Sequence, residues 1–438
     1  MQPLELYIHI PFCVKKCAYC DFLSGPAGEQ EREDYVNLLA EEIRNCPDAV
    51  KDYEVVSIFF GGGTPSLLTG EQMERLMDVI RETFTLGQDA EITMEMNPGT
   101  VEEEKLRKYK EAGVNRLSIG LQSVNDEELR LLGRIHTYEE FLEAYHMARD
   151  CGFANLNVDL ISAIPGQTVE SWRHTLEKVI ALHPEHISAY SLILEEGTPF
   201  YKKYVEEENE EGPKLPDEDA ERQMYWDTET LMEKNGYHRY EISNYAKEGC
   251  ACRHNLGYWE RVPYLGFGIG AASLVPGELI GKLDLEERRN QKKEKRGKAV
   301  GDSESHVNLE TAGNKKNAVE MKKERAAGKM GRYTNPAKLK DYALSYQNKF
   351  HAELLTEAEE MEEFMFLGLR KMNGISKKIF SEYFGKSLED VYGEPIQKLE
   401  NLNLLEQNVD RVWLTKRGID VSNSVFVEFI LETYDLET

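Results

Sequence analysis

The chain has few cysteines, a deficit of basic residues and no long apolar run. It contains 7 cysteines among 438 residues, and 53 lysines and arginines against 79 aspartates and glutamates, which gives a formal net charge of −26. So acidic a chain disfavours nucleic acid as a partner, because phosphates select basic surfaces. No apolar run approaches the roughly 18 residues of a membrane span, and no basic, signal-like segment follows Met1. With 41% hydrophobic residues for a core, these features predict a cytoplasmic protein whose thiols stay reduced.

Three of the cysteines lie together in one short segment. Cys13, Cys17 and Cys20 have the spacing C-x3-C-x2-C and directly follow residues 4–10, an apolar run that we interpret as a strand. A [4Fe–4S] cluster usually takes four cysteines, so three thiolates leave one iron open to a small chelating molecule. Zinc is the alternative, but it needs a fourth ligand nearby, for which His9 is a candidate. Disulfides are not expected, because three clustered cysteines cannot all pair with one another.

Residues 5–193 alternate between short apolar, β-branched runs and amphipathic stretches with helical period. The predicted strands are 5–10, 54–60, 90–96, 115–120, 155–161 and 187–193. The predicted helices are 33–45, 71–84, 101–112, 138–150 and 168–182, one of which starts at the capping box Thr137-x-x-Glu140. This alternation predicts an α/β fold with a parallel sheet covered by helices. Six such units are too few for a closed barrel, so we expect an open, partial (βα)6 barrel with its site at the carboxyl ends of the strands.

Unusual residues recur where the predicted strands end. The segment 61–66, GGGTPS, follows the second strand, and glycines there allow the backbone to approach a ligand closely. Glu95, Gln122, Arg134 and Asp159 lie at or after the ends of later strands. Each of them alone could equally be a cap or a turn residue. Their repeated placement at the same edge of the sheet favours a single binding site.

These segments resemble the oxygen-independent coproporphyrinogen III oxidase-like family of radical S-adenosylmethionine (SAM) proteins. The resemblance covers nearly the whole chain, in order, through HIPFCVKKCAYCDF, GGGTPS, EMNPGT, RLSIGLQS, LLGRIH, IPGQT and HISAYSLILEEGTPFY. It implies a radical SAM partial barrel and a [4Fe–4S] cluster on Cys13, Cys17 and Cys20. In this superfamily the open iron chelates SAM, and the reduced cluster cleaves it to a 5′-deoxyadenosyl radical.

The resemblance also implies which residues contact SAM. The methionyl part would meet Gly62, Gly63 and Thr64. Its amino, carboxylate and ribose groups would be held by Glu95, Gln122, Arg134 and Asp159. The side chains packed around the cofactor would be Tyr7, Tyr19 and Ile193. The chemistry agrees, since arginine suits a carboxylate and an acidic residue suits a ribose diol.

Three features separate the chain from the decarboxylating oxidases of that family. Those enzymes have a further cysteine where this sequence has Phe22, and a long segment ahead of the cluster, whereas only six residues precede Tyr7 here. Residues 254–259 match H-N-x-x-Y-W. All three features resemble the sister group of the family, the HemW heme chaperones. They imply heme as the cargo and heme-acceptor proteins, such as respiratory enzymes, as partners, whether at the membrane or in the cytoplasm.

Several alternatives stay open from the sequence. Radical decarboxylation of coproporphyrinogen III to protoporphyrinogen IX, or radical chemistry on another tetrapyrrole, would make the chain an enzyme. His254 suits a heme ligand near the open face of the barrel, or it braces the sheet from within the core. Cys250 and Cys252 are candidates for a second soft-metal site or a heme attachment. The sequence decides neither enzymatic activity nor the oligomeric state.

The composition divides the chain into four parts. We expect the radical SAM barrel in residues 1–235, an extension of it with the H-N-x-x-Y-W segment in 236–285, and a winged-helix-like C-terminal domain in 333–438. Residues 286–332 contain 14 lysines and arginines, 8 aspartates and glutamates, and no aromatic residue other than a histidine. Such a stretch cannot bury enough apolar surface to order itself, so we predict a disordered insertion. A basic lure for an anionic partner is the alternative interpretation.

Overall fold

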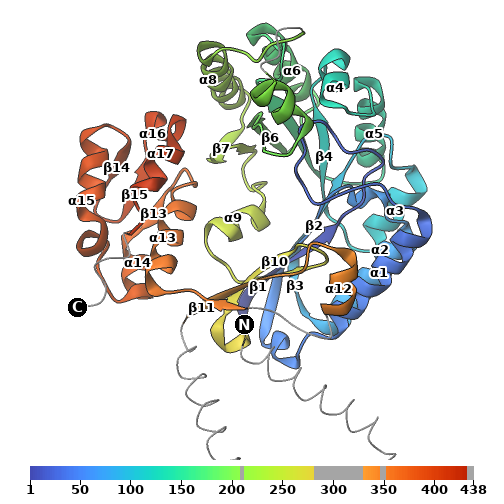
Figure 1. The fold of residues 1–438 in the computed structure, drawn as a ribbon, viewed down its shortest axis with the longest axis horizontal. Helices are drawn as coiled ribbons and strands as arrows, with labels where there is room; N and C mark the ends of the chain where they lie inside the picture. The colour runs from blue at the N-terminus through green and yellow to red at the C-terminus, as the bar shows by residue number, and fades with distance from the viewer. Residues whose placement is uncertain (208–211, 281–328, 346–351, 432–438) are drawn as a thin grey trace, which may run out of the picture.

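The computed structural model describes residues 1–207, 212–280, 329–345 and 352–431 (Figure 1). Its centre is a parallel sheet, as the alternation of the sequence predicts. The strands in parallel register are β1 (Gln2–Ile10), β2 (Tyr53–Gly62), β3 (Thr85–Met96), β4 (Arg116–Gln122), β5 (Asn155–Ser162) and β6 (His186–Ser191). All six predicted strands are present, and the predicted partial α/β barrel is confirmed.

Helices cover the outer face of this sheet (Figure 1). They are α1 (Glu29–Arg44), α2 (Gly70–Thr83), α3 (Glu103–Glu111), α4 (Asp126–Leu132), α5 (Tyr138–Asp150) and α6 (Val169–Ile180). The predicted capping box starts α5, where the Thr137 hydroxyl accepts from the Glu140 amide. The sequence did not predict α4, which is one of the shorter helices and ends at Gly133 in a left-handed conformation, φ 78°.

The sheet continues beyond the six predicted strands at both edges. Next to β1 lies a further parallel strand, β9 (Tyr264–Phe267), which is not among the strands predicted from the sequence. Antiparallel strands follow it: β10 (Ala272–Pro276), β11 (Met330–Thr334) and β12 (Glu353–Leu354). At the other edge, β8 (Asn244–Ala246) and β7 (His238–Glu241) pair antiparallel with β6 and with each other. The described chain thus forms one 12-stranded sheet.

The predicted boundary between residues 332 and 333 divides a strand, β11 (Met330–Thr334). Most of the predicted insertion, residues 286–328, lies outside the described residues. Its last residues belong to β11, where Met330 is buried and its amide donates to Glu360 Oε1 at 3.0 Å. Because β11 and β12 pair within the barrel sheet, the barrel extends to Leu354 and the C-terminal domain begins after it. The charge count over the whole of residues 286–332 gave no sign of the short strand at the end of this range.

The C-terminal domain has its own core and a small antiparallel sheet. Its strands are β13 (Ile375–Ser376), β14 (Leu405–Gln407) and β15 (Arg411–Leu414). Its helices are α13 (Glu357–Gly368), α14 (Lys377–Phe384), α15 (Leu388–Asn401), α16 (Lys416–Asp420) and α17 (Ser422–Val427). The core is built from large side chains such as Phe380, Tyr392 and Val412. Helices around a small hairpin are the predicted winged-helix-like arrangement.

The remaining described helices follow β6, β8 and β11 in the chain. They are α7 (Pro199–Tyr201) with the π-helical turn Lys202–Glu206, α8 (Glu218–Lys234), α9 (Arg253–Trp259) and α12 (Leu339–Ser345). Two short 3₁₀ turns, Asp48–Asp52 and Pro65–Leu67, complete the described elements. In Figure 1 α9 lies between the barrel and the C-terminal domain, and α9 contacts α13. Beside it, the largely buried Arg261 guanidinium lies 3.4 Å from Glu360 and 3.4 Å from Glu363 of α13.

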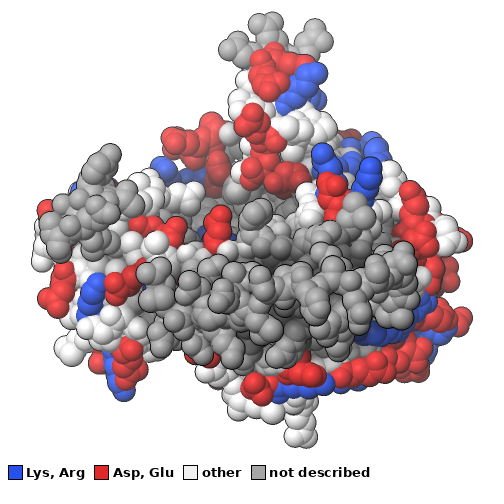
Figure 2. Space-filling model, turned by 60° about the horizontal axis from the view of Figure 1, so that its bottom comes forward, with Lys and Arg blue, Asp and Glu red and all other residues white. Residues whose placement is uncertain are grey.

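The surface reflects the acidic composition. Figure 2 shows acidic side chains spread over the described part of one face, with basic side chains interspersed among them. Many charged side chains of the described chain form exposed pairs, such as Lys108–Glu71 and Arg107–Glu103, and such pairs contribute little to stability because water and salt screen them. Within the described ranges, no helix is both long enough and apolar enough to cross a bilayer.

The close approach of Gly418 in α16 to Leu404 gives a stability prediction. A Cβ at Gly418 would lie 1.9 Å from the backbone carbonyl oxygen of Leu404, so Gly418→Ala should destabilise the C-terminal domain by roughly 1–3 kcal/mol or more. Amide hydrogen exchange in β14 and β15 measures the loss. The matched control is Gly393→Ala in α15, where an added Cβ meets nothing within 4 Å; it should be neutral or stabilise by up to about 1 kcal/mol. Equal exchange in the two variants would contradict the prediction.

Candidate functional site

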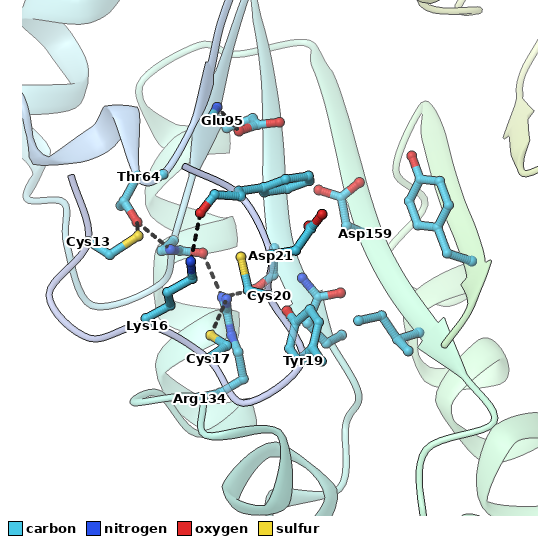
Figure 3. A pocket seen from close by; sticks show the side chains of 18 of the residues that line it. Cys13, Lys16, Cys17, Tyr19, Cys20, Asp21, Thr64, Glu95, Arg134 and Asp159 are labelled. Atoms are coloured by element: carbon cyan, nitrogen blue, oxygen red, sulfur yellow. Dashed lines mark hydrogen bonds between the residues drawn. The ribbon is translucent and has the colours of Figure 1, made fainter. Parts of the chain in front are cut away.

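A cavity of about 470 Å³ opens at the carboxyl ends of the parallel strands (Figure 3). It brings together every predicted site residue except Tyr7 and His254. The members that line it are Cys13, Cys17, Tyr19, Cys20, Gly62, Gly63, Thr64, Glu95, Gln122, Arg134, Asp159 and Ile193. Because these residues come from successive strand ends and the loops after them, the parallel sheet is what makes them neighbours.

The cysteine loop is fixed to its neighbours by backbone contacts. After β1 the Cys13 amide donates to the Gly25 carbonyl at 2.9 Å, and farther along the Ala18 amide donates to the Leu132 carbonyl at 2.9 Å. The Gly63 amide donates to the Ile10 carbonyl at 2.8 Å. A Cβ on Gly63 would lie only 2.6 Å from the Phe12 carbonyl oxygen. A glycine at this position therefore allows the end of β2 to pack directly against the cysteine loop.

Polar donors approach two of the three thiols. The Thr64 hydroxyl lies 3.6 Å from Cys13 Sγ, and Arg134 Nη1 lies 3.7 Å from Cys17 Sγ. Figure 3 shows these two pairs on either side of Cys20. Burial raises the pKa of the Cys20 thiol, so binding an electrophilic metal is what would hold it as a thiolate.

The donor set fits a cluster better than a single zinc ion. Tetrahedral zinc needs ligands that converge on one point. Over the described ranges, no group of three or more His, Cys, Asp and Glu side chains is arranged to hold one metal ion. Three thiols spread along one wall of a cavity match the ligand set of a cube-shaped cluster with an open iron. The assignment of the cluster to these cysteines stays a prediction.

Arg134 is held rigidly at the end of α4. Its Nη2 donates to Asn97 Oδ1 at 2.6 Å and to the Gly120 carbonyl at 2.6 Å. Asn97 in turn donates to the Thr64 hydroxyl at 2.8 Å. The Arg134 Nε is buried without a partner, which leaves donor capacity for an anionic ligand. We did not predict Asn97 as a site residue, although its place after the strand that carries Glu95 was a signal for it.

Four carboxyl groups line the cavity, those of Asp21, Glu95, Asp159 and Glu195, and two of them have resolved pKa shifts. Glu95 Oε2 accepts from the Gly62 amide at 3.1 Å. Burial, reinforced by the charge of Asp159, raises the pKa of Glu95 to about 8. Burial also raises the pKa of Asp159, although hydrogen bonds from Ser118 and Asn157 and the charge of Arg116 oppose that rise. A cationic group placed beside Glu95 would lower its pKa and favour the carboxylate.

The backbone at Gln122 is strained. Its φ is 77°, a left-handed conformation that is uncommon for a residue other than glycine. The strain coincides with an irregularity in the pairing of β4 and β5 between Gly120 and Gln122. This kink turns the strand end toward the cavity and frees the Gly120 carbonyl for Arg134. Strain of this kind is typical of positions that hold a ligand.

The mouth of the cavity carries exposed apolar side chains. Phe22 is 59% exposed and Ile193 is 67% exposed, and both line the cavity. Ile193 therefore lies at the rim rather than enclosed around a cofactor. Lys15 and Lys16 line the same mouth, and the Lys16 ammonium donates to the Phe22 carbonyl at 2.9 Å. Exposed apolar groups beside a cavity are typical of a surface that receives a ligand or a partner.

The structure does not place His254 at the open face, and that expectation is wrong. His254 is 1% exposed, and its Nδ1 lies 2.8 Å from the Ser57 hydroxyl. Its ring stacks on Phe59, with 5.2 Å between ring centroids. The reason is topological: α9 precedes β9, which runs parallel to β1, so α9 lies toward the amino-terminal ends of the strands. Burial lowers the pKa of His254 to about 3, which fits the bracing role that the sequence left open.

Two further candidates from the sequence, Tyr7 and Cys252, also lie outside the cavity. Tyr7 does not line the cavity, and its hydroxyl lies 3.0 Å from His9 Nδ1. Cys252 is buried, and its thiol donates to Glu91 Oε1 at 3.4 Å. Burial raises the pKa of Cys252 to about 12, so its thiol stays protonated. Cys252 does not line the cavity that holds the three clustered cysteines.

Comparisons with known proteins agree with the architecture of the site. A model of the radical SAM superfamily matches residues 7–179, and a model of the HemN C-terminal domain matches residues 355–421. The heme chaperone HemW of Bacillus subtilis is 34% identical over 97% of this chain and 99% of its own length. HemW of Lactococcus lactis is 32% identical over 98% of both chains. HemW of Escherichia coli is 44% identical over 63% of this chain and 71% of its own.

A solved structure shares the fold over almost the whole chain. Coproporphyrinogen III oxidase (HemN) from Escherichia coli, described as a radical SAM enzyme, superposes with a TM-score of 0.73 over 98% of this chain and 90% of its own. The two are 22% identical in sequence. At that identity the likeness concerns the fold, and function has to be argued from the site.

The approach of Gly63 to the cysteine loop gives a second prediction. Gly63→Ala places a Cβ 2.6 Å from the Phe12 carbonyl oxygen and 2.8 Å from its amide nitrogen, so the loop must move and should lose most of its iron and sulfide. Chemical analysis after anaerobic reconstitution measures both. Gly25→Ala, in the same loop, is the matched control, because an added Cβ there meets nothing within 4 Å. A full cluster in Gly63→Ala would show that this approach does not support the metal site.

Proposed function

Because the chain belongs to the HemW family of radical SAM proteins, we propose that it is a heme chaperone of the cytoplasm. It holds a [4Fe–4S] cluster on Cys13, Cys17 and Cys20, binds SAM in the cavity, and carries heme to acceptor proteins such as respiratory enzymes. The single observation that carries the proposal is the convergence of three thiols, one arginine and the carboxyl groups of Glu95 and Asp159 on one cavity with an apolar mouth.

The cavity supports SAM by charge and by shape. SAM carries a carboxylate, an ammonium, a sulfonium and a ribose diol. Arg134, fixed by Asn97, offers its free Nε toward the carboxylate. Glu95 suits the ammonium or the sulfonium, and Asp159 suits the ribose diol. Bound there, the cluster and SAM together supply electron transfer and radical chemistry.

The mouth of the cavity supports heme as the cargo. Heme is a flat apolar macrocycle with two carboxylates, and the exposed Phe22 and Ile193 offer apolar contact beside the cavity. The Lys15 ammonium at the same mouth suits a propionate. Phe22 stands where the decarboxylating oxidases of the wider family carry a cysteine, so a binding function accounts for that difference. His254 is assigned to the core and not to the heme.

Heme binding provides the test of this proposal. With the cluster reconstituted, heme should bind the wild-type protein and pass to a heme-free respiratory enzyme, followed by the Soret absorbance of both proteins. Phe22→Ser and Ile193→Ser should each weaken heme binding by roughly five- to thirtyfold, since each removes about 1–2 kcal/mol of apolar contact. His254→Ala should keep heme affinity and lower the free energy of unfolding instead.

The control for the apolar variants is Val409→Ser. Val409 is 91% exposed and does not line the cavity, so its replacement should leave heme affinity unchanged. Equal heme affinity in Phe22→Ser, Ile193→Ser and the wild type would remove the mouth as the heme site. Turnover of coproporphyrinogen III to protoporphyrinogen IX, with SAM and a reductant present, would contradict the chaperone proposal and favour the oxidase.

SAM binding should release a proton at pH 7. The pKa of Glu95 is raised to about 8 in the ligand-free protein, so the group is mostly protonated at that pH. An adjacent cation favours the carboxylate and lowers the pKa, so binding expels the proton. Calorimetry in buffers of different ionisation enthalpy measures this release.

The variant Glu95→Gln should abolish the proton release and weaken SAM binding by roughly tenfold or more, as expected for a lost charged hydrogen bond. Glu139→Gln, on the exposed surface of α5, is the control and should change neither quantity. Proton release that persists in Glu95→Gln would assign it to another group.

A further inference from the structure

A chain of hydrogen bonds runs from the cavity through the interior of the barrel to α9. Asp159 Oδ1 accepts from Asn157 Nδ2 at 2.8 Å. Asn157 Oδ1 lies 2.6 Å from His186 Nδ1, and His186 Nε2 lies 2.8 Å from the Tyr240 hydroxyl. The Tyr240 hydroxyl also accepts from the amide of Cys252 at 3.3 Å, and Cys252 is the N-cap residue of α9. The chain joins β5, β6, β7 and α9.

The partners fix the direction of every bond in this chain. The side-chain oxygen of Asn157 can only accept, so His186 must carry its proton on Nδ1. His186 Nε2 is then an acceptor, so the Tyr240 hydroxyl donates to it. The Cys252 amide donates to Tyr240 in turn. Every group therefore donates toward Asp159, and aligned bonds of this kind strengthen one another in a medium of low dielectric constant.

The surroundings keep the chain in this single arrangement. Asn157 and His186 are buried, and so is Arg116, whose guanidinium lies among these groups. Burial, with the positive charge of Arg116 adding to it, lowers the pKa of His186 well below its ordinary value, so the ring stays neutral. The other titratable groups that face Asp159 are Glu95 from β3 and Tyr190 from β6. A neutral His186 with a fixed tautomer acts as a rigid link.

We propose that His186 and Tyr240 are positioning residues for the cavity: through Asn157 they orient Asp159 for its ligand and connect ligand binding to the first turn of α9. This inference rests on the proposed binding of SAM in the cavity. Neither residue lines the cavity, so both act through Asp159. The link reaches the C-terminal domain as well, because the Met372 amide donates to the Tyr240 carbonyl at 3.0 Å.

The decisive variant is Tyr240→Phe, which removes one hydroxyl and breaks the chain at its centre. SAM should bind roughly three- to tenfold more weakly, as for a lost hydrogen bond in a network. The acid limb of the affinity–pH profile should move to higher pH, since Asp159 loses support for its carboxylate. Addition of SAM should slow amide exchange in α9 of the wild type and leave it unchanged in the variant.

Tyr237→Phe is the matched control. Tyr237 is a buried tyrosine three residues away, and its hydroxyl donates to the Pro184 carbonyl at 2.7 Å, outside the chain. Tyr237→Phe should lose stability and keep the SAM affinity and pH profile of the wild type. This separates positioning from a general loss of packing. Nitrogen-15 spectra of labelled histidine give a second readout, and they should show His186 in the Nδ1–H tautomer.

The outcomes distinguish this inference from the proposed function. If Tyr240→Phe binds SAM with the same affinity and the same affinity–pH profile as the wild type, the inference is overturned and the proposed function is not affected. An Nε2–H tautomer of His186 would do the same, because it reverses the direction of the chain. A wild-type protein that binds no SAM would overturn the proposed function and the inference together.

Discussion

The site depends on the contact between the ends of β1 and β2. The Gly63 amide donates to the Ile10 carbonyl, and this hydrogen bond holds the backbone of Gly63, which has no side chain, against the cysteine loop. Thr64, the next residue, reaches Cys13 and accepts from Asn97, which holds Arg134 beside Cys17. The close packing that Gly63 allows thus sets the distance between the cysteine thiols and the polar groups, such as Arg134, that suit a charged ligand. The rest of the barrel keeps these two strands in register.

Much of this arrangement could be predicted from the chain alone. The period of the apolar residues located the parallel strands, and glycines and acids repeated at strand ends located the cavity, since such ends meet at one edge. What periodicity could not supply was long-range pairing. Tyr264–Phe267 is a short run with a glycine, so it resembled a loop, and only its pairing with β1 makes it a strand. The end of the charged segment at Met330 was missed for the same reason. Helix α4 was missed because its 7 residues are too few to show a clear helical period.

The error over His254 follows from that missed strand. A segment that precedes a parallel strand enters the sheet at the amino-terminal edge, opposite the edge where the cysteine loop lies. Without β9, the order of the chain suggested that α9 could fold toward the cavity. With β9 in place, the histidine lies against Ser57 and Phe59 in the interior. Residue type alone, a histidine beside aromatic rings, fits a cofactor ligand and a core brace equally well.

The two ends of the twelve-stranded sheet have a consequence for self-association. An incomplete barrel leaves two free edges, and exposed edge strands are templates for pairing with further chains. Here none of the parallel strands lies at an edge. One edge strand, β12, is two residues long. The other, β7, contacts the C-terminal domain, where Lys371 forms a β-bridge with Glu241 and the Met372 amide donates to the Tyr240 carbonyl. Among the described residues, therefore, neither edge of the open barrel carries a long strand on which copies of the protein could stack.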